Sequence, residues 1–403
     1  MGVKEAPVWI TNCTVVDIED PGRSFQGSVR VADGAIVELT EGTAPSGSAP
    51  VDLDGRALLP GLITCHTHLT EVYPFAAADG ETSADSALRA LGAATHALHA
   101  GVTTIRCVHE QHQADLRLRS ADERGWVRTP RILGAGRAIT TTGGHGDGGG
   151  GCVRADGPDA FLRAAREELA AGADHIKIFI SGGIGDASEN ITTVQMSIDE
   201  MRAVGGAAEV HGGYVVAHAG NSASIALALE AGVRSFEHGY ELNDATAAAM
   251  VERGAFLTPT INVTHVRSWM LARGFDESQV QRAAEVEPMH ARSLETAIRH
   301  GVTIVHGTDG LPAEAVDGTT MTVVEAELLS SAGLGPRGAL LAATANAAEL
   351  VGMGSRIGKV AVGYAADLIA VRGDPLADIS ALRSIDWVMS RGEVVRDTRG
   401  VGL

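Results

Sequence analysis

Residues 85–108 read DSALRALGAATHALHAGVTTIRCV, an Ala/Leu-rich stretch with helical spacing that ends at Gly101 and passes directly into a β-branched run. Such a run is typical of a buried strand. The same order of helix, glycine and strand returns at 170–177, 230–237 and 299–306. Each glycine stands where a helix C-cap would release the chain. The pattern therefore predicts repeated units of one helix and one parallel strand.

Eight runs fit the strand positions of this repeat: LITCHTH (62–68), VTTIRCV (102–108), RILGAGRAI (131–139), HIKIFIS (175–181), YVVAHA (214–219), SFEHG (235–239), FLTPTI (256–261) and VTIVHGTD (302–309). Amphipathic stretches predict helices at 85–101, 159–174, 197–213 and 277–301, with a last helix at 336–352. Eight parallel strands with intervening helices are typical of an α/β fold, the (β/α)8 TIM barrel. We expect this barrel to span residues 59–356.

The two ends of the chain carry a different pattern, in which short strands alternate with turns. Strands are predicted within 8–17, 28–39 and 51–59, and again within 358–373 and 385–397. Because chain termini usually lie close together, we expect residues 1–58 and 357–403 to form one small β-sandwich domain beside the barrel.

Composition excludes several classes of partner. The chain has 32 basic and 50 acidic side chains, a formal charge of −18, which argues against nucleic acid or an anionic membrane as the main partner. No uncharged apolar run is long enough for a membrane span, and the N-terminal residues lack the apolar segment of a secretory signal. The four cysteines form no CxxC pair, which argues against a thiolate zinc site. We expect a cytoplasmic protein acting on a small molecule.

Polar side chains gather at the predicted strand ends, where barrels of this kind place their active sites. His66 and His68 are two residues apart at the first strand, so both point to the same side. Other strands end in His218, His238 and Asp309. A single buried histidine is more often a hydrogen-bonded core residue than a ligand. Five ligand-type residues on one rim instead favour a metal site.

Lys177 is unusual because it lies inside the apolar run HIKIFI. An unpaired ammonium there is costly to bury, so something must neutralise it or use it. Three explanations fit: a carboxylate partner, a Schiff base with a carbonyl substrate, or conversion to a carbamate that bridges two cations.

The ordered segments LLPGLITCHTHLT, HIKIFISGG, VVAHAG, FEHG, GTDG and GYAADLIAVRGDPL resemble the amidohydrolase superfamily over nearly the whole chain. Within it the chain is similar to prolidase-like and imidazolonepropionase-like members. The lysine of the fourth strand favours the prolidase-like branch, since the imidazolonepropionases it resembles lack a carboxylated lysine.

The resemblance implies a binuclear centre with two divalent ions, most simply zinc. It implies that His66, His68 and Asp309 bind one ion, that His218 and His238 bind the second, and that N6-carboxylated Lys177 bridges both. Two such ions lower the pKa of a shared water and polarise the scissile carbonyl. Asp309 would act as general base and then general acid in hydrolysis of a C–N amide bond, as in a dipeptide or an N-acyl amino acid.

Two more residues are candidate substrate contacts in this branch. His145 follows the third strand and Tyr240 follows His238, and both offer a donor for the carbonyl oxygen. The competing interpretation of His145 is an exposed loop residue. Arg137 is either a contact for a substrate carboxylate or part of a surface ion pair.

Two loops leave alternatives open. His109, Glu110 and His112 form either a third metal site or a loop that lines the pocket and alters specificity. Residues 143–157, GGHGDGGGGCVRADG, fit a mobile loop over the site or a disordered connection, and they lack the GK[ST] of a phosphate-binding loop.

Two alternative functions remain. One is a mononuclear hydrolase of a cyclic amide, or a deaminase, in which Lys177 contacts the substrate. The other is a non-hydrolytic metal-binding barrel in a biosynthetic pathway. The Ala-rich outer helices also fit a homo-oligomer.

Overall fold

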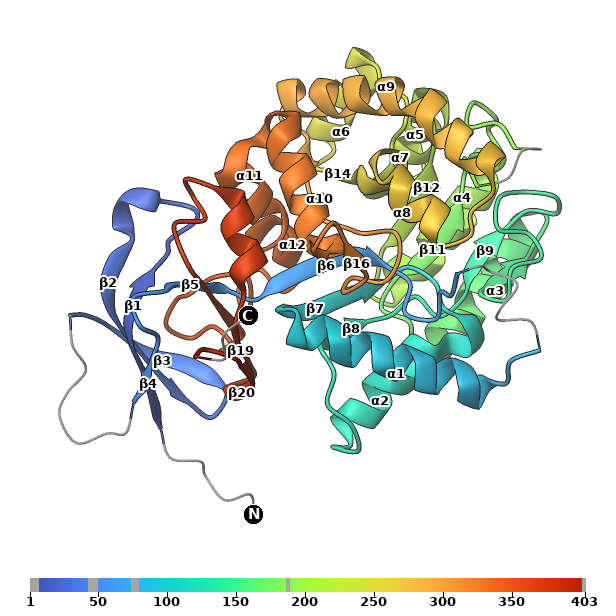
Figure 1. The fold of residues 1–403 in the computed structure, drawn as a ribbon. Helices are drawn as coiled ribbons and strands as arrows, with labels where there is room; N and C mark the ends of the chain where they lie inside the picture. Colours follow the sequence, from blue (N-terminus) through green and yellow to red (C-terminus); the bar gives the residue numbers. More distant parts are fainter. Residues whose placement is uncertain (1–6, 43–49, 74–79, 186–188, 401–403) are drawn as a thin grey trace.

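The computed structural model describes residues 7–42, 50–73, 80–185 and 189–400, which form a parallel-stranded barrel with a smaller sheet beside it (Figure 1). The barrel strands are β6 (Leu62–Thr67), β7 (Val102–Cys107), β8 (Arg131–Leu133), β9 (Ala138–Thr140), β11 (Ile176–Phe179), β12 (Val215–Ala219), β13 (Ser235–His238), β14 (Phe256–Thr258) and β15 (Thr303–Ile304). The predicted parallel α/β arrangement is confirmed.

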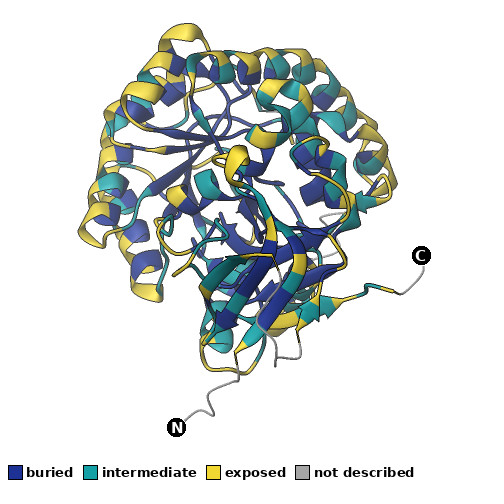
Figure 2. Cartoon of the chain, turned by 90° about the vertical axis from the view of Figure 1, so that its left-hand side faces the viewer, coloured by how far each residue is buried: buried dark blue, intermediate teal, exposed yellow. Residues whose placement is uncertain are grey.

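Helices surround these strands. They are α1 (Ser83–His99), α2 (Ala114–Glu123), α3 (Pro158–Ala171), α4 (Ile198–Val210), α5 (Ser222–Glu230), α6 (Asp244–Glu252), α7 (Asn262–His265), α8 (Arg267–Ala272), α9 (Glu277–His300), α10 (Met321–Leu329), α11 (Gly335–Ala342) and α12 (Ala345–Leu350). Their outer faces are exposed while the strands inside are buried (Figure 2). Within the described residues, no helix combines the length and the apolar character needed to cross a membrane.

The third predicted strand is interrupted. The run 131–139 divides into β8, which pairs with β7, and β9, which pairs with β11. Gly136 between them has a left-handed φ of +69°, and a Cβ there would lie 2.3 Å from a carboxylate oxygen of Glu168. The barrel closes between its last and first strands, where Cys65 N donates to His306 O at 2.7 Å.

The predicted helix 336–352 is wrong in one respect, since it is two helices. Thr344 separates α11 from α12 with a backbone at φ −139° and ψ −93°. Its hydroxyl donates to Leu340 O at 2.6 Å. The interruption turns α12 so that Ala347 and Ala348 pack against Ile63 and Cys65 of β6.

Strands from both chain ends share one sheet, composed of β1 (Val8–Val15), β2 (Phe25–Ala32), β3 (Ala35–Glu41), β4 (Val51–Asp52), β5 (Ala57–Pro60), β18 (Leu368–Val371), β19 (Trp387–Ser390) and β20 (Glu393–Asp397). The junction is the antiparallel pairing of β5 with β18, where Leu59 opposes Ile369. Ile10, Val29 and Trp387 share its buried core. Hydrogen bonds join these strands into a single sheet, so the two-layer sandwich stays a prediction.

Three short strands lie in the loops. β10 (Cys152–Arg154) pairs with β9, and β16 (Ala315–Val316) pairs with β17 (Thr319–Thr320). Because β10 lies within residues 143–157, that segment is not a structureless connection.

Candidate active site

A pocket opens at the carboxyl ends of the barrel strands. All eight residues predicted as ligands or substrate contacts line it: His66, His68, His145, Lys177, His218, His238, Tyr240 and Asp309. They come from strands around the barrel and from the loops that follow strands, so the fold brings together the whole candidate set.

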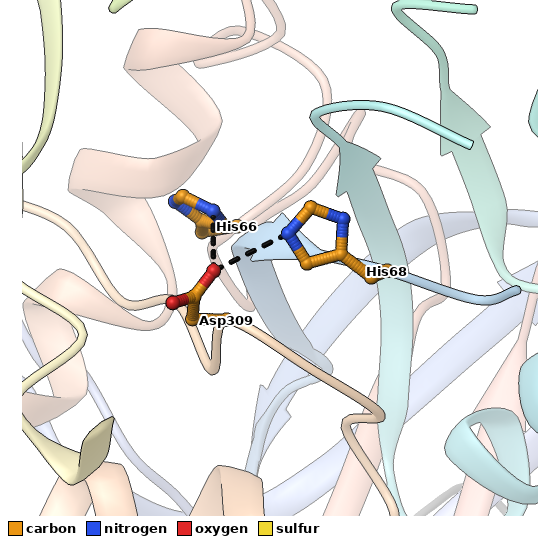
Figure 3. A group of neighbouring side chains, drawn as sticks. All are labelled: His66, His68 and Asp309. Carbon is orange, nitrogen blue, oxygen red and sulfur yellow. Dashed lines mark hydrogen bonds and ion pairs between the residues drawn. The ribbon is translucent and has the colours of Figure 1, made fainter. Parts of the chain in front are cut away.

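His66, His68 and Asp309 form the tightest group (Figure 3). Asp309 Oδ1 lies 2.8 Å from His66 Nε2 and 3.2 Å from His68 Nε2. The i, i+2 spacing of the two histidines therefore aims both imidazoles at one point, as the sequence predicts. These three side chains can hold a metal ion, since one ligand atom from each lies within 4.8 Å of the others.

Each of the four histidines has one ring nitrogen occupied by a protein acceptor. His66 Nδ1 donates to Glu237 at 2.6 Å and His68 Nδ1 to the His109 carbonyl at 3.2 Å. His238 Nδ1 donates to Thr260 Oγ1 at 2.7 Å, while His218 Nε2 donates to the Gly182 carbonyl at 3.2 Å. Such bonds orient each ring and, when the ring is neutral, leave its other nitrogen with a lone pair, which is the arrangement of metal-binding histidines.

His218 and His238 lie beside the first group. Their ring centroids are 4.6 Å apart, and the His238 ring is 5.0 Å from that of His66. Burial and the neighbouring histidines hold the pKa of both His218 and His238 well below the usual value, so both rings are neutral at pH 7. Neutral imidazole is the form that binds metals.

Lys177 is 1% exposed, and its ammonium nitrogen lies 5.4 Å from the centroid of the Phe179 ring. No other described residue forms an ion pair with it within 4.0 Å, so the carboxylate-partner explanation is not supported among them. Burial lowers the pKa of Lys177 to about 8.

Behind His66 lies a fully buried ion pair. Arg106 donates to Glu237 Oε1 at 2.8 Å, and the other oxygen of Glu237 accepts from His66. Burial opposes ionisation of Glu237, but Arg106 and His66 outweigh it and hold the pKa of Glu237 below its usual value. The carboxylate thus connects His66 to a charge fixed in the barrel interior.

Left-handed backbone follows three consecutive strands. His238, Thr260 and Asp309 have φ of 66°, 47° and 51°. This conformation is uncommon for residues other than glycine and is concentrated at functional sites. It turns the chain at the strand ends, where His238 and Asp309 project into the pocket.

The two predicted substrate contacts, His145 and Tyr240, each stack on a candidate ligand histidine. The His145 ring stacks on that of His218 with centroids 4.2 Å apart, and its Nδ1 contacts Glu189 at 2.6 Å. Tyr240 is buried, and its ring stacks on His238 at 5.2 Å. Burial, with Asp309 nearby, keeps the pKa of Tyr240 well above 10, so its hydroxyl remains a donor.

The 109–112 segment is not a third metal site. His109 lines the pocket and its ring packs 4.2 Å from that of His68. Glu110 instead accepts from the backbone N–H groups of Leu69 and Thr70 and so fastens the loop after His68. His112 is exposed. The pocket-lining alternative is therefore the correct one for His109.

Arg137 lies outside the described pocket lining and pairs with the buried carboxylate of Glu168 at 2.6 Å. The ion-pair interpretation thus holds, although its partner is buried.

Sequence reasoning missed an apolar wall of the pocket. Tyr73, Trp269 and Phe275 form an aromatic cluster, with ring centroids 5.1 Å apart for Tyr73 and Trp269 and 5.2 Å apart for Tyr73 and Phe275. Val266 and Met270 extend this wall. These residues come from loops and from α8, whose positions depend on tertiary packing.

Comparison with known proteins places the chain in a family. The model of the amidohydrolase family matches residues 57–395. The chain belongs to the amidohydrolase family. The ochratoxinase of Aspergillus niger is 28% identical over 355 residues, covering 81% of this chain and 72% of that protein. An imidazolonepropionase of Sphingopyxis alaskensis is 26% identical over 412 residues, covering 89% of each.

Solved structures of amidohydrolases superpose closely. A prolidase complexed with N-methylphosphonate-L-proline has a TM-score of 0.88 and 31% identity, covering 97% of this chain and 100% of that one. A Xaa-Pro dipeptidase with bound methionine has the same TM-score and coverage at 28% identity. The predicted superfamily and its prolidase-like and imidazolonepropionase-like branch are confirmed. This amidohydrolase is a hydrolase acting on C–N bonds, not a non-hydrolytic barrel.

Proposed function

We propose that this amidohydrolase is a metal-dependent enzyme that hydrolyses the C–N amide bond of a dipeptide, an N-acyl amino acid or a related amide. One observation carries the proposal. Four imidazoles, each with one nitrogen occupied by a protein acceptor, line one pocket together with Asp309 and the buried Lys177.

The proposed centre takes two divalent ions, most simply zinc. His66, His68 and Asp309 would hold one ion, while His218 and His238 would hold the other. Lys177 fits a bridging role after its neutral amine adds CO2 and releases one proton, which leaves a carbamate anion. The lowered pKa of Lys177 favours the neutral amine that this addition requires. When bound, the two ions would supply Lewis acidity and a water of lowered pKa.

The side chains have separate tasks in this proposal. Burial opposes the charge on Asp309, but His66 and the hydrogen bonds from His66 and His68 outweigh burial and hold the pKa of Asp309 well below 3.8, so it is ionised at neutral pH. It accepts the proton of the attacking water and returns it to the leaving nitrogen. His145 and Tyr240 donate hydrogen bonds to the carbonyl oxygen as negative charge develops there.

The alternative is a mononuclear cyclic-amide hydrolase or deaminase. The compact group of His66, His68 and Asp309 and the similarity to an imidazolonepropionase favour it. In that enzyme Lys177 would contact the substrate as an ammonium.

Metal stoichiometry and a Lys177 variant test the proposal together. We expect two equivalents of metal per chain in enzyme loaded with zinc and bicarbonate. Lys177→Ala should retain at most one equivalent and lose activity on a panel of dipeptides and N-acyl amino acids. The matched control is Lys359→Ala, which removes a lysine paired with Glu19 outside the pocket. One equivalent in both the parent and Lys177→Ala would favour the mononuclear alternative.

Three broader proposals accompany this function. Residues 1–58 with 357–403 form one domain and residues 59–356 the catalytic domain, an assignment supported by the pairing of β5 with β18. The enzyme acts in the cytoplasm on a small molecule rather than on nucleic acid. Its Ala-rich helices support a homo-oligomer.

A further inference from the structure

The pocket extends from the histidines toward the aromatic cluster in a definite order. Glu71 lies next, because it lines the pocket and its Oε2 is 3.2 Å from the position that a Cβ would take on Gly310, the residue after Asp309. Glu71 also accepts a hydrogen bond from the Tyr73 hydroxyl, and Tyr73 contacts Trp269 and Phe275. From the reacting centre outward, the wall therefore presents a carboxylate and then an aromatic cluster.

A second hydrogen-bond acceptor belongs to Asn262, another residue of the pocket lining. Asn262 is 3% exposed and lines the pocket. Its Nδ2 donates to the Thr308 carbonyl at 2.8 Å, which fixes the orientation of the amide. Its buried Oδ1 accepts no hydrogen bond from any residue that the structure describes. A buried acceptor of this kind requires a donor, because leaving it unsatisfied costs free energy.

The charges of the wall favour a cation. Glu71 and Glu314 line it, and Lys177 is the sole lysine or arginine among the described lining residues. Glu314 is already paired with Arg273 and accepts from Trp269 Nε1. Glu71 therefore remains as the carboxylate beside the reacting centre, and aromatic faces also attract cations.

Resting on the proposed function, we propose that the substrate is an aminoacyl amide with a free α-ammonium and an aromatic side chain. The ammonium donates to Glu71 and Asn262 Oδ1, and the ring packs among Tyr73, Trp269 and Phe275. The order in the pocket matches the order in such a substrate, where the ammonium lies on the carbon next to the scissile carbonyl and the side chain extends beyond it.

Three amides with one leaving group test this on the metal-loaded enzyme: L-Phe-L-Ala, L-Ala-L-Ala and 3-phenylpropanoyl-L-Ala. The second removes the ring and the third removes the ammonium. We expect kcat/KM for L-Phe-L-Ala to exceed each of the others at least about tenfold, since a site built to bind an N–H donor rejects analogues that lack it. Equal rates for L-Phe-L-Ala and 3-phenylpropanoyl-L-Ala would overturn the inference while leaving amide hydrolysis intact.

Calorimetric binding gives a readout that does not depend on turnover. We expect 2-phenylethylamine to bind at least about tenfold more tightly than 2-phenylethanol, which has a hydroxyl in place of the ammonium. Glu71→Gln should remove this preference, and Trp269→Ala should weaken both ligands. Trp126→Ala is the control, because Trp126 is 71% exposed and outside the pocket. If Glu71→Gln still binds 2-phenylethylamine more tightly than 2-phenylethanol, the proposed ammonium site at Glu71 is wrong.

The two proposals fail in different ways. If none of the three amides is hydrolysed but 2-phenylethylamine binds with the expected dependence on Glu71 and Trp269, the proposed reaction is wrong and the ligand chemistry stands. If the amides are hydrolysed without preference for ring or ammonium, the reaction stands and the substrate class is wrong.

Discussion

Glu237 holds His66 from behind, with its Oε2 2.6 Å from His66 Nδ1 while its Oε1 accepts from Arg106 at 2.8 Å. All three side chains are at most 1% exposed. The orientation of the first proposed ligand thus depends on an ion pair inside the barrel. Buried charges of this kind are costly to separate, because the remaining partner has no solvent to stabilise it.

Glu237→Gln should therefore weaken both metal binding and the fold. We expect metal affinity to fall about 10–100-fold, as for other losses of a partner behind a ligand histidine. The free energy of unfolding should fall by about 3–5 kcal/mol because Arg106 loses its countercharge. Chelator competition and urea unfolding measure the two effects. Glu168→Gln is the control, since Glu168 is buried and paired with Arg137 outside the described pocket lining. It should lose stability only, and unchanged metal affinity in Glu237→Gln would contradict the role assigned to Glu237.

Metal binding should depend on pH through His68. Burial alone would lower the pKa of His68, but the hydrogen bond to Asp309 and the charge of Glu71 outweigh burial and raise it to about 9. The metal-free protein therefore carries a proton on His68 at neutral pH, and a metal ion must displace it. Affinity should rise about tenfold per pH unit up to about pH 9, with release of a proton.

Calorimetry in buffers of different ionisation enthalpy measures that proton. His96→Gln, which alters an exposed histidine on α1, should keep the same slope. If the metal affinity does not change between pH 6 and pH 9, His68 is not the titrating ligand.

Tyr240→Phe should reduce kcat about 10²–10³-fold if the hydroxyl stabilises the developing oxyanion. Metal content should stay unchanged, because the ring that stacks on His238 is retained. Steady-state kinetics measures the change in kcat, and metal analysis of the same variant measures its metal content. Tyr364→Phe, which removes a hydroxyl bonded to the Gly354 carbonyl, should leave kcat unchanged. Full activity of Tyr240→Phe would exclude the tyrosine from catalysis.

Asp386→Asn should destabilise the sheet that is formed by strands from both chain ends. Arg56 donates to both oxygens of Asp386 at 2.9 Å, and both side chains are 8% exposed. Breaking a buried pair costs about 3–5 kcal/mol. Asp199→Asn, which breaks an exposed pair with Arg202, should cost less than about 1 kcal/mol. Urea unfolding measures the free energy of unfolding that each variant loses. Similar losses in the two variants would show that the buried pair of Arg56 with Asp386 contributes no more than the exposed pair.

The sequence predicted the strands and the pocket rim well because both follow from periodicity. His66 and His68 are recognised by their spacing, while His218, His238 and Asp309 are recognised by their place after apolar runs. The interruption after β8 was missed because Gly134 and Gly136 lie in a run that otherwise alternates like a strand. The break at Thr344 was missed because its neighbours are strong helix formers.

The ion pair of Arg106 with Glu237, which contacts His66, was also missed, although the sequence contains an indication of it. Arg106 stands inside VTTIRCV just as Lys177 stands inside HIKIFI, so both are charges within an apolar strand. One such charge predicts a partner but does not identify it, since strand register decides that Glu237 faces Arg106. The aromatic cluster gave no signal, because Tyr73 is separated from Trp269 and Phe275 by about 200 residues of sequence.

The pairing of β5 with β18 has a consequence for synthesis of the protein. β5 leads directly into β6, which carries His66, yet its partner strand follows about 310 residues later. At ribosomal speeds of about 5–20 residues per second, β5 waits roughly 15–60 s for that partner. The nascent chain therefore exposes an unpaired apolar edge for most of its translation, a period in which a chaperone that binds extended apolar segments would find its target at residues 57–60.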